Sequence, residues 1–137
     1  MRFETDILVT VGDVNYGGHV GNDRFLLFFH EARIRFLSSL GRSELDIGGG
    51  QGMIMSEARV KYKAQVMMGD ALVVSITTCE IRSARFSLLY EISNKESGQI
   101  VAEGRTFMSA FDYERNRVAR LPVEFAGQLA SYEIDLS

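Results

Sequence analysis

The fold is decided by residues 24–40, which read RFLLFFHEARIRFLSSL. Apolar side chains recur here at helical spacing, at Phe25, Phe29, Ala32, Phe36 and Leu40. Further apolar residues widen this stripe, namely Leu26, Leu27, Phe28 and Leu37. A helix that is apolar over so much of its circumference is enclosed by other elements. The segment therefore predicts one long central helix that the rest of the chain covers.

The ends of this helix carry stop signals. Asn22 or Asp23 is a suitable N-cap residue, and Gly41 is a suitable residue just beyond the C-terminus. The preceding residues 12–18 contain three glycines and Asn15, which suit tight turns. We therefore expect a loop that leads directly into the start of the helix.

The remainder of the chain reads mostly as strands. Residues 3–11 are rich in Val, Ile and Thr, and four more strands are expected near residues 53–66, 70–82, 85–94 and 99–112. After Pro122, a short amphipathic helix closes the chain. The pattern predicts an α+β domain spanning residues 1–137, with an antiparallel sheet of about five strands wrapped around one helix. Such a sheet leaves edges to cover, which favours association with a second copy.

The composition excludes several classes of protein. The 137 residues carry 15 Lys and Arg against 18 Asp and Glu, a net charge of −3, which argues against a nucleic-acid binder. One cysteine, Cys79, can form neither an intrachain disulfide nor a CxxC metal motif. No apolar run of 18 residues occurs, and residues 1–13 do not resemble a signal peptide. We expect a soluble cytoplasmic protein without a bound metal.

Two stretches resemble a known family. Residues 13–22, DVNYGGHVGN, are similar to the D-x-D-x-x-G-H-V-N-N segment of hotdog-fold acyl-coenzyme A thioesterases of the hydroxybenzoyl-CoA thioesterase type. Residues 28–33, FFHEAR, resemble the F-x-E-A-R helix of that family. The similarity continues through Tyr62, Gly69-Asp70, Gly98, residues 102–104 and residues 120–122.

This resemblance implies a hotdog fold and a reaction. The expected activity is hydrolysis of an acyl-CoA, or of an acyl chain on a carrier protein, to a carboxylic acid and a free thiol. The family needs no metal or prosthetic group, so no cofactor is expected beyond the coenzyme A of the substrate. Its active sites lie at the interface of a homodimer, and two dimers commonly form a tetramer.

The sequence departs from the family pattern at Asn15, which takes the place of the catalytic second Asp. A neutral amide can neither attack the thioester nor accept a proton, because it offers only a carbonyl acceptor and two N–H donors. Asn15 could still orient a water molecule or hold the thioester carbonyl, and related thioesterases acting on carrier-bound chains also have Asn here. Gly21 likewise replaces the first Asn of the N-N pair. The alternative is a non-catalytic module that binds an acyl thioester or a partner protein.

Three residues are candidates for the missing base. His19 titrates near neutrality in peptides, with a hydrogen-bonded loop histidine as the alternative reading. Asp13 could accept a proton, but its carboxylate is more suited to bracing the turn. Glu31 lies on the helix, where Arg35 four residues later is an available ion-pair partner. Glu57 is a weaker candidate of the same kind, and His30 is expected to be structural.

The remaining candidates bind the substrate. Backbone N–H groups at the helix start would hold the developing oxyanion, and the resemblance assigns this role to Gly18, Val20, Gly21 and Asn22. Arg82 and Arg85 flank an expected hairpin, where the family places a basic cluster that contacts the phosphates of coenzyme A. The alternative for these arginines is a solvated turn.

Overall fold

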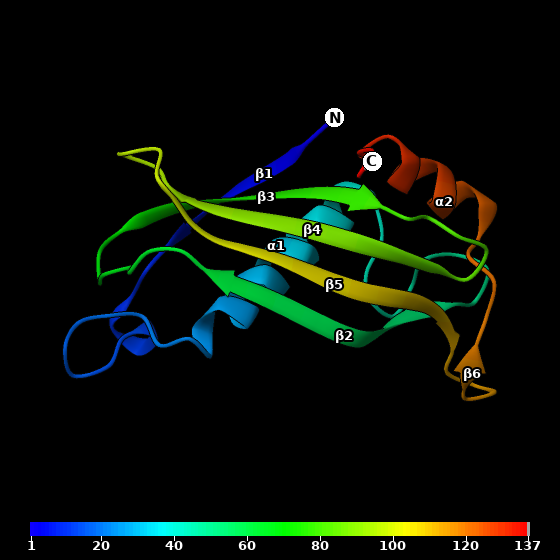
Figure 1. Ribbon diagram of the computed structural model, residues 1–137. Coiled ribbons are helices and arrows are strands. Elements are labelled where there is room, and N and C mark those ends of the chain that lie inside the picture. Colours follow the sequence, from blue (N-terminus) through cyan, green and yellow to red (C-terminus); the bar gives the residue numbers. More distant parts are fainter. Residues whose placement is uncertain (137) are drawn as a thin grey trace.

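The structure, a computed structural model, describes residues 1–136 (Figure 1). The strands are β1 (Phe3–Leu8), β2 (Gly52–Tyr62), β3 (Ala71–Cys79), β4 (Arg85–Asn94), β5 (Ile100–Asp112) and β6 (Arg117–Val118). The helices are α1 (Arg24–Ser39) and α2 (Val123–Ala130), with one 3-10 turn at Val11–Asp13. The main strands pair antiparallel in the order β1-β3-β4-β5-β2, and β6 pairs with β5.

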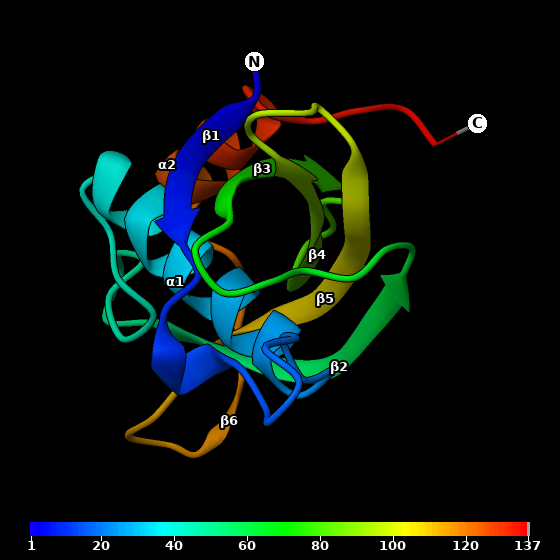
Figure 2. The same cartoon turned by 90° about the vertical axis from the view of Figure 1, so that its left-hand side faces the viewer.

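The sheet curls around α1, as the end-on view shows (Figure 2). This arrangement confirms the predicted α+β fold with a central helix, because the widened apolar stripe of α1 is buried. The side chains of Phe29, Ala32 and Phe36 are 0% exposed. Alternate residues of β3 and β4 face the helix, including the buried Leu72, Val74, Ile76, Leu88 and Ile92.

Several predicted boundaries were wrong. The first strand ends at Leu8 and not at residue 11, because Thr10 and Asp13 bond to each other across the 3-10 turn. The second ends at Tyr62 and not at residue 66, because Lys63 and Ala64 both donate backbone hydrogen bonds to Val101. The third ends at Cys79, since the next residue, Glu80, takes a positive φ of 48° that leaves the extended conformation.

The C-terminus of α1 matches the prediction. Gly41 has a φ of +73°, its N–H donates to Ser38, and the N–H of Arg42 donates to Leu37 at 2.8 Å. This is a Schellman motif, which a glycine favours. Asp23 occupies the N-cap position of the same helix, but its side chain makes no capping hydrogen bond.

The depth of α1 in the sheet depends on Gly104 of β5. The ring of Phe29 stacks on Tyr90 with centroids 4.5 Å apart, and a Cβ on Gly104 would come within 2.3 Å of the Phe29 ring. The missing side chain therefore admits Phe29 to the sheet surface.

Neither α1 nor α2, the two α-helices of residues 1–136, has the length and apolar character of a membrane-spanning helix.

Gly104→Ala is therefore expected to destabilise the protein by about 1–3 kcal/mol through overpacking, measured by urea denaturation. Gly127→Ala is the matched control, because a Cβ there meets nothing within 4 Å. In the interior of α2 this control should be neutral or stabilising by up to about 1 kcal/mol. Equal stability of the two variants would show that Phe29 does not press on Gly104.

Candidate active site

The loop before α1 folds tightly on itself. The N–H of Asn15 donates to the carbonyl of His19 at 2.9 Å, and the N–H of Gly18 donates to the carbonyl of Asn15 at 3.0 Å. The loop is then fastened to the segment after β2, because Val20 donates to Val66 at 2.8 Å and Met68 donates to Gly18 at 3.1 Å. These bonds set the loop and the start of α1 against residues 62–66.

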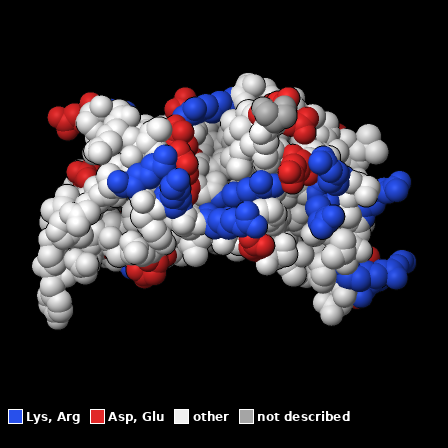
Figure 3. Space-filling view, viewed as in Figure 1, with Lys and Arg blue, Asp and Glu red and all other residues white. Residues whose placement is uncertain are grey.

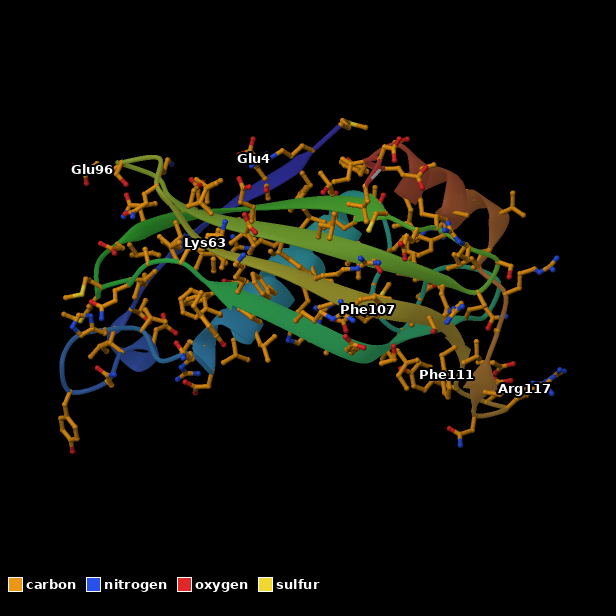
Figure 4. All side chains as sticks on the ribbon, viewed as in Figure 1. Glu4, Lys63, Glu96, Phe107, Phe111 and Arg117 are labelled. Carbon is orange, nitrogen blue, oxygen red and sulfur yellow. The ribbon has the colours of Figure 1, made fainter. Side chains whose placement is uncertain are left out.

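An open pocket lies between these two segments. The loop side consists of predicted site residues: Asn15, His19, Val20, Gly21 and Asn22. The other lining residues are Phe25, in the first turn of α1, and residues 62–66. Figure 4 labels one of them, Lys63, just beyond the end of β2. The structure thus brings most of the predicted catalytic and oxyanion residues to one place.

The side chain of Asn15 is oriented by its own loop. Its Oδ1 accepts hydrogen bonds from the N–H groups of Gly17 at 3.0 Å and His19 at 3.4 Å. The orientation of an amide follows from such bonds, so the Nδ2 group is the end left for the pocket. Asn15 therefore presents a hydrogen-bond donor where an Asp would present a carboxylate oxygen.

Two of the four predicted oxyanion donors are committed elsewhere. The N–H of Gly18 bonds to Asn15, and the N–H of Val20 bonds to Val66. Gly21 and Asn22 stand at the start of α1, and their N–H groups have no acceptor within residues 1–136. The hydroxyl of Tyr62 donates to the carbonyl of Asn22 at 3.1 Å. The free donors at the site are thus those of Gly21 and Asn22, and Tyr62 steadies the peptide chain beside them.

Asp13 and Glu31 are both engaged away from the pocket. The Oδ2 atom of Asp13 accepts from the N–H of Thr10 at 2.9 Å and from its hydroxyl at 3.2 Å, so this carboxylate braces the turn. Glu31 pairs with Arg35 at 3.1 Å, and Arg35 also bonds to residues 5 and 6 of β1. Neither carboxylate lines the pocket.

His19 does line the pocket. Its Nδ1 atom is buried and has no hydrogen-bond partner in the described chain. Its ring lies against Gly17, where an added Cβ would be 3.1 Å from the ring carbon Cδ2. Of the three predicted bases, only His19 lines the pocket, but one of its two ring nitrogens, Nδ1, is buried.

The arginines at the hairpin lie on the outer face of the sheet. Arg82 and Arg85 line a hollow together with Ser56 and Phe107, and Figure 4 shows Phe107 on this face. Two further arginines, missed from the sequence, flank the Phe107 ring: the guanidinium of Arg105 is 4.4 Å from its centroid and that of Arg59 is 4.8 Å away. Figure 3 shows Lys and Arg gathered across the middle of this face. The alternation along β2 and β5 was the sequence signal for these residues.

The remaining titratable candidates have structural partners. Glu57 pairs with Arg59, and His30 bonds to Glu44 at 2.8 Å, consistent with the structural role expected for His30. Tyr90, a core residue that was not a candidate, also has a structural role. Burial raises the pKa of its hydroxyl, which stays protonated and bonds to Thr106 at 2.8 Å.

Comparison with known proteins identifies relatives. Residues 9–129 match the model of the thioesterase-like superfamily. The 1,4-dihydroxy-2-naphthoyl-CoA hydrolase of Synechocystis sp. is 30% identical over 83% of this chain and 84% of its own length. The crystal structure of a 1,4-dihydroxy-2-naphthoyl-CoA thioesterase from Synechocystis superposes with a TM-score of 0.86 at 28% identity, covering 95% of this chain and 96% of that one.

A more distant structure shares the fold. A Staphylococcus aureus protein solved in complex with CoA has a TM-score of 0.89 at 18% identity, covering all of this chain and 89% of its own.

Tyr62→Phe is expected to lower kcat for thioester hydrolysis several-fold. The lost hydrogen bond, worth about 1 kcal/mol, would no longer hold the carbonyl of Asn22 in place beside the N–H donors. The Phe ring would keep its edge-on contact with Phe25, at 5.2 Å between centroids. Tyr113→Phe is the control, since it removes a similar bond, 2.7 Å to the carbonyl of Met53, outside the pocket. Steady-state kinetics that change equally in both variants would assign the Tyr62 bond to stability alone.

Proposed function

The chain belongs to the thioesterase-like superfamily, and we propose that it hydrolyses acyl-CoA thioesters in the pocket beside Asn15. As a member of this family it is a thioester hydrolase. The observation that carries the choice of pocket is the pair of N–H groups of Gly21 and Asn22, which have no acceptor within residues 1–136 and belong to residues that line one pocket with Asn15.

These donors suit the polarity of the reaction. When water adds to the thioester carbon, the carbonyl oxygen becomes negative. The N–H groups of Gly21 and Asn22 would hold that oxygen at the positive end of the α1 dipole, where one well-placed donor is worth about 3 kcal/mol. The Nδ2 group of Asn15 would hold the carbonyl or the attacking water. We propose that the reaction uses water and groups of the protein, and that no cofactor takes part.

We propose an aromatic acyl group as substrate. The Synechocystis relative is named for a naphthoyl-CoA, which is a fused aromatic thioester. In this chain the pocket contains Phe25 and Tyr62, whose rings already meet edge-on. Aromatic rings favour such edge contacts with a further ring.

The nucleotide end of coenzyme A would lie on the outer sheet face. Its phosphates need cations, and Arg82 and Arg85 line a hollow there without an ion pair in the described chain. Arg59 and Arg105 flank the ring of Phe107, which lines the hollow. Their ion-pair partners, Glu57 and Glu80, also line it. Arg forms bidentate hydrogen bonds with phosphate, which suits this role.

A second copy of the chain would bring these two parts together. Within residues 1–136, β2 pairs only with β5, so its other edge is open to β2 of a second copy. Ser56 and Tyr62 lie about 20 Å apart along β2, at about 3.3 Å per residue. Antiparallel pairing of the two β2 strands would reverse these ends, placing the arginine hollow of one copy beside the Asn15 pocket of the other. We therefore propose a homodimer that pairs through β2. From the family resemblance we further propose that two such dimers assemble into a tetramer. We propose a cytoplasmic location for the protein.

The test is release of free thiol from aromatic, short and long acyl-CoAs, followed with a thiol-reactive dye. Burial raises the pKa of the Cys79 thiol, which is 1% exposed, so the native enzyme adds little background. Asn15→Ala should lower kcat about 100-fold, because it removes the donor and the acceptor for two loop N–H groups.

Asn15→Asp is the matched control for the loop. It keeps the acceptor for Gly17 and His19 and so should retain the thermal stability that Asn15→Ala loses. Wild-type turnover in Asn15→Ala would remove Asn15 from the mechanism. Absence of turnover on the whole panel in the wild type would point to a carrier-bound substrate or to a module that only binds.

The double variant Arg82→Ala with Arg85→Ala tests the phosphate site. It should raise KM for acyl-CoA about tenfold with kcat nearly unchanged, because the lost contacts are far from the thioester. The corresponding acyl-pantetheine lacks these phosphates and should show no change in KM. An equal rise in KM for both substrates would place the two arginines elsewhere than at the phosphates.

A further inference from the structure

Hydrolysis at this pocket requires a proton acceptor that the expected residues do not supply. Asn15 has no basic group, and the carboxylates of Asp13 and Glu31 are already engaged, the first by Thr10 and the second by Arg35. His19 faces the pocket, but its Nδ1 atom is buried without a partner. No described residue bonds to this Nδ1 to fix the tautomer and orientation of the ring, as a histidine acting as general base requires.

Asp23 is the carboxylate that stands beside the pocket without another task. It occupies the N-cap position of α1, where an Asp normally accepts a hydrogen bond from the first turn. Its side chain makes no such bond, and it has no ion pair in residues 1–136. It is exposed in the single chain. A side chain that departs from its usual local role is expected at functional sites.

The carboxylate of Asp23 is folded back over Gly21. A Cβ built on Gly21 would be only 2.6 Å from Oδ1 of Asp23. Gly21 itself lines the pocket and carries one of the two free N–H groups. Asp23 is not itself a lining residue of the pocket, but its carboxylate lies against Gly21, which is, and the absence of a side chain at Gly21 makes room for it.

We propose that Asp23 is the general base of the hydrolysis, an inference that rests on the proposed function. Its carboxylate takes a proton from water as the water oxygen bonds to the thioester carbon and the carbonyl π pair moves to oxygen. The oxyanion, held by the N–H groups of Gly21 and Asn22, then collapses and breaks the C–S bond. The proton passes from Asp23 to the thiolate sulfur. The sum is acyl-CoA plus water giving carboxylic acid plus coenzyme A.

Asp23→Asn tests the proposal directly. The Asp23 side chain makes no capping hydrogen bond in the described chain, so the thermal unfolding midpoint should not change. The value of kcat should fall about 100-fold or more, with little change in KM, because a general base contributes at this scale. Glu124→Gln is the matched control, since it removes a carboxylate from the first turn of α2 and should leave kcat unchanged.

The pH profile separates Asp23 from His19. The proposal expects the acidic limb of kcat/KM in the wild type to vanish in Asp23→Asn and to persist in His19→Gln. An acidic limb that disappears in His19→Gln and persists in Asp23→Asn would overturn it.

Gly21→Ala supplies an independent arm. The added methyl must displace the Asp23 carboxylate, which is the end of a mobile side chain, so folding should be preserved while kcat falls. If Asp23 acts as proposed, Gly21→Ala should cost nothing further in the Asp23→Asn background. A full additional loss there would mean that the methyl acts on the oxyanion donors, and it would overturn the claim that Gly21 serves to make room for the Asp23 carboxylate.

The outcomes distinguish the two levels of proposal. Asn15→Asp in the Asp23→Asn background should restore part of kcat, because it places a carboxylate oxygen where the Nδ2 group of Asn15 lies. A wild type that turns over acyl-CoA, with Asp23→Asn equally active, would overturn the role of Asp23 and leave the thioesterase standing. A wild type that turns over no acyl-CoA would refute the proposed function itself.

Discussion

The stacking of Phe29 on Tyr90 above Gly104 is the contact on which the arrangement of the molecule depends. It sets how deeply α1 sits in the curved sheet, and the depth of α1 determines where its N-terminus emerges. Because Phe25 lies one turn earlier on the same buried face, that N-terminus comes out against Tyr62 at the end of β2. The pocket is thus a consequence of core packing, since Phe29 and Tyr90, which set the depth of α1, are not among the residues that line it.

The loop before α1 separates two roles that one carboxylate could have combined. One oxygen of an Asp at position 15 would organise the loop by accepting from Gly17 and His19, and the other would act on the substrate. Asn15 retains the first role, since its Oδ1 makes both bonds. The second role requires an acid, and Asp23 stands eight residues later on the same side of the helix start. The chemistry of the site can therefore be preserved while its charge moves to another residue.

The fold could be predicted from the sequence because its signals are local. The apolar stripe of residues 24–40 and the alternation of β3 and β4 both report burial, and burial decides the architecture. The ends of strands were less accessible, as at Tyr62, where the chain leaves the ladder because of backbone bonds to a distant residue, Val101. Likewise, sequence could nominate Gly18 and Val20 as oxyanion donors, but only coordinates reveal that their N–H groups already have acceptors.

The two departures from the family pattern, at Asn15 and at Gly21, belong together for a physical reason. A side chain at position 21 would occupy the space that Oδ1 of Asp23 now fills, at 2.6 Å from the first added carbon. The absence of a side chain at Gly21 therefore leaves room for a carboxylate beside a residue that lines the pocket, and the proposed base is needed because position 15 carries no acid. Asn15 without Gly21 would leave the site without a base. Gly21 without Asn15 would make room for a second carboxylate that the site does not need. Read singly, Gly21 is only a flexible loop residue, and Asp23 is only a helix cap. Their shared geometry gives each of them a specific role.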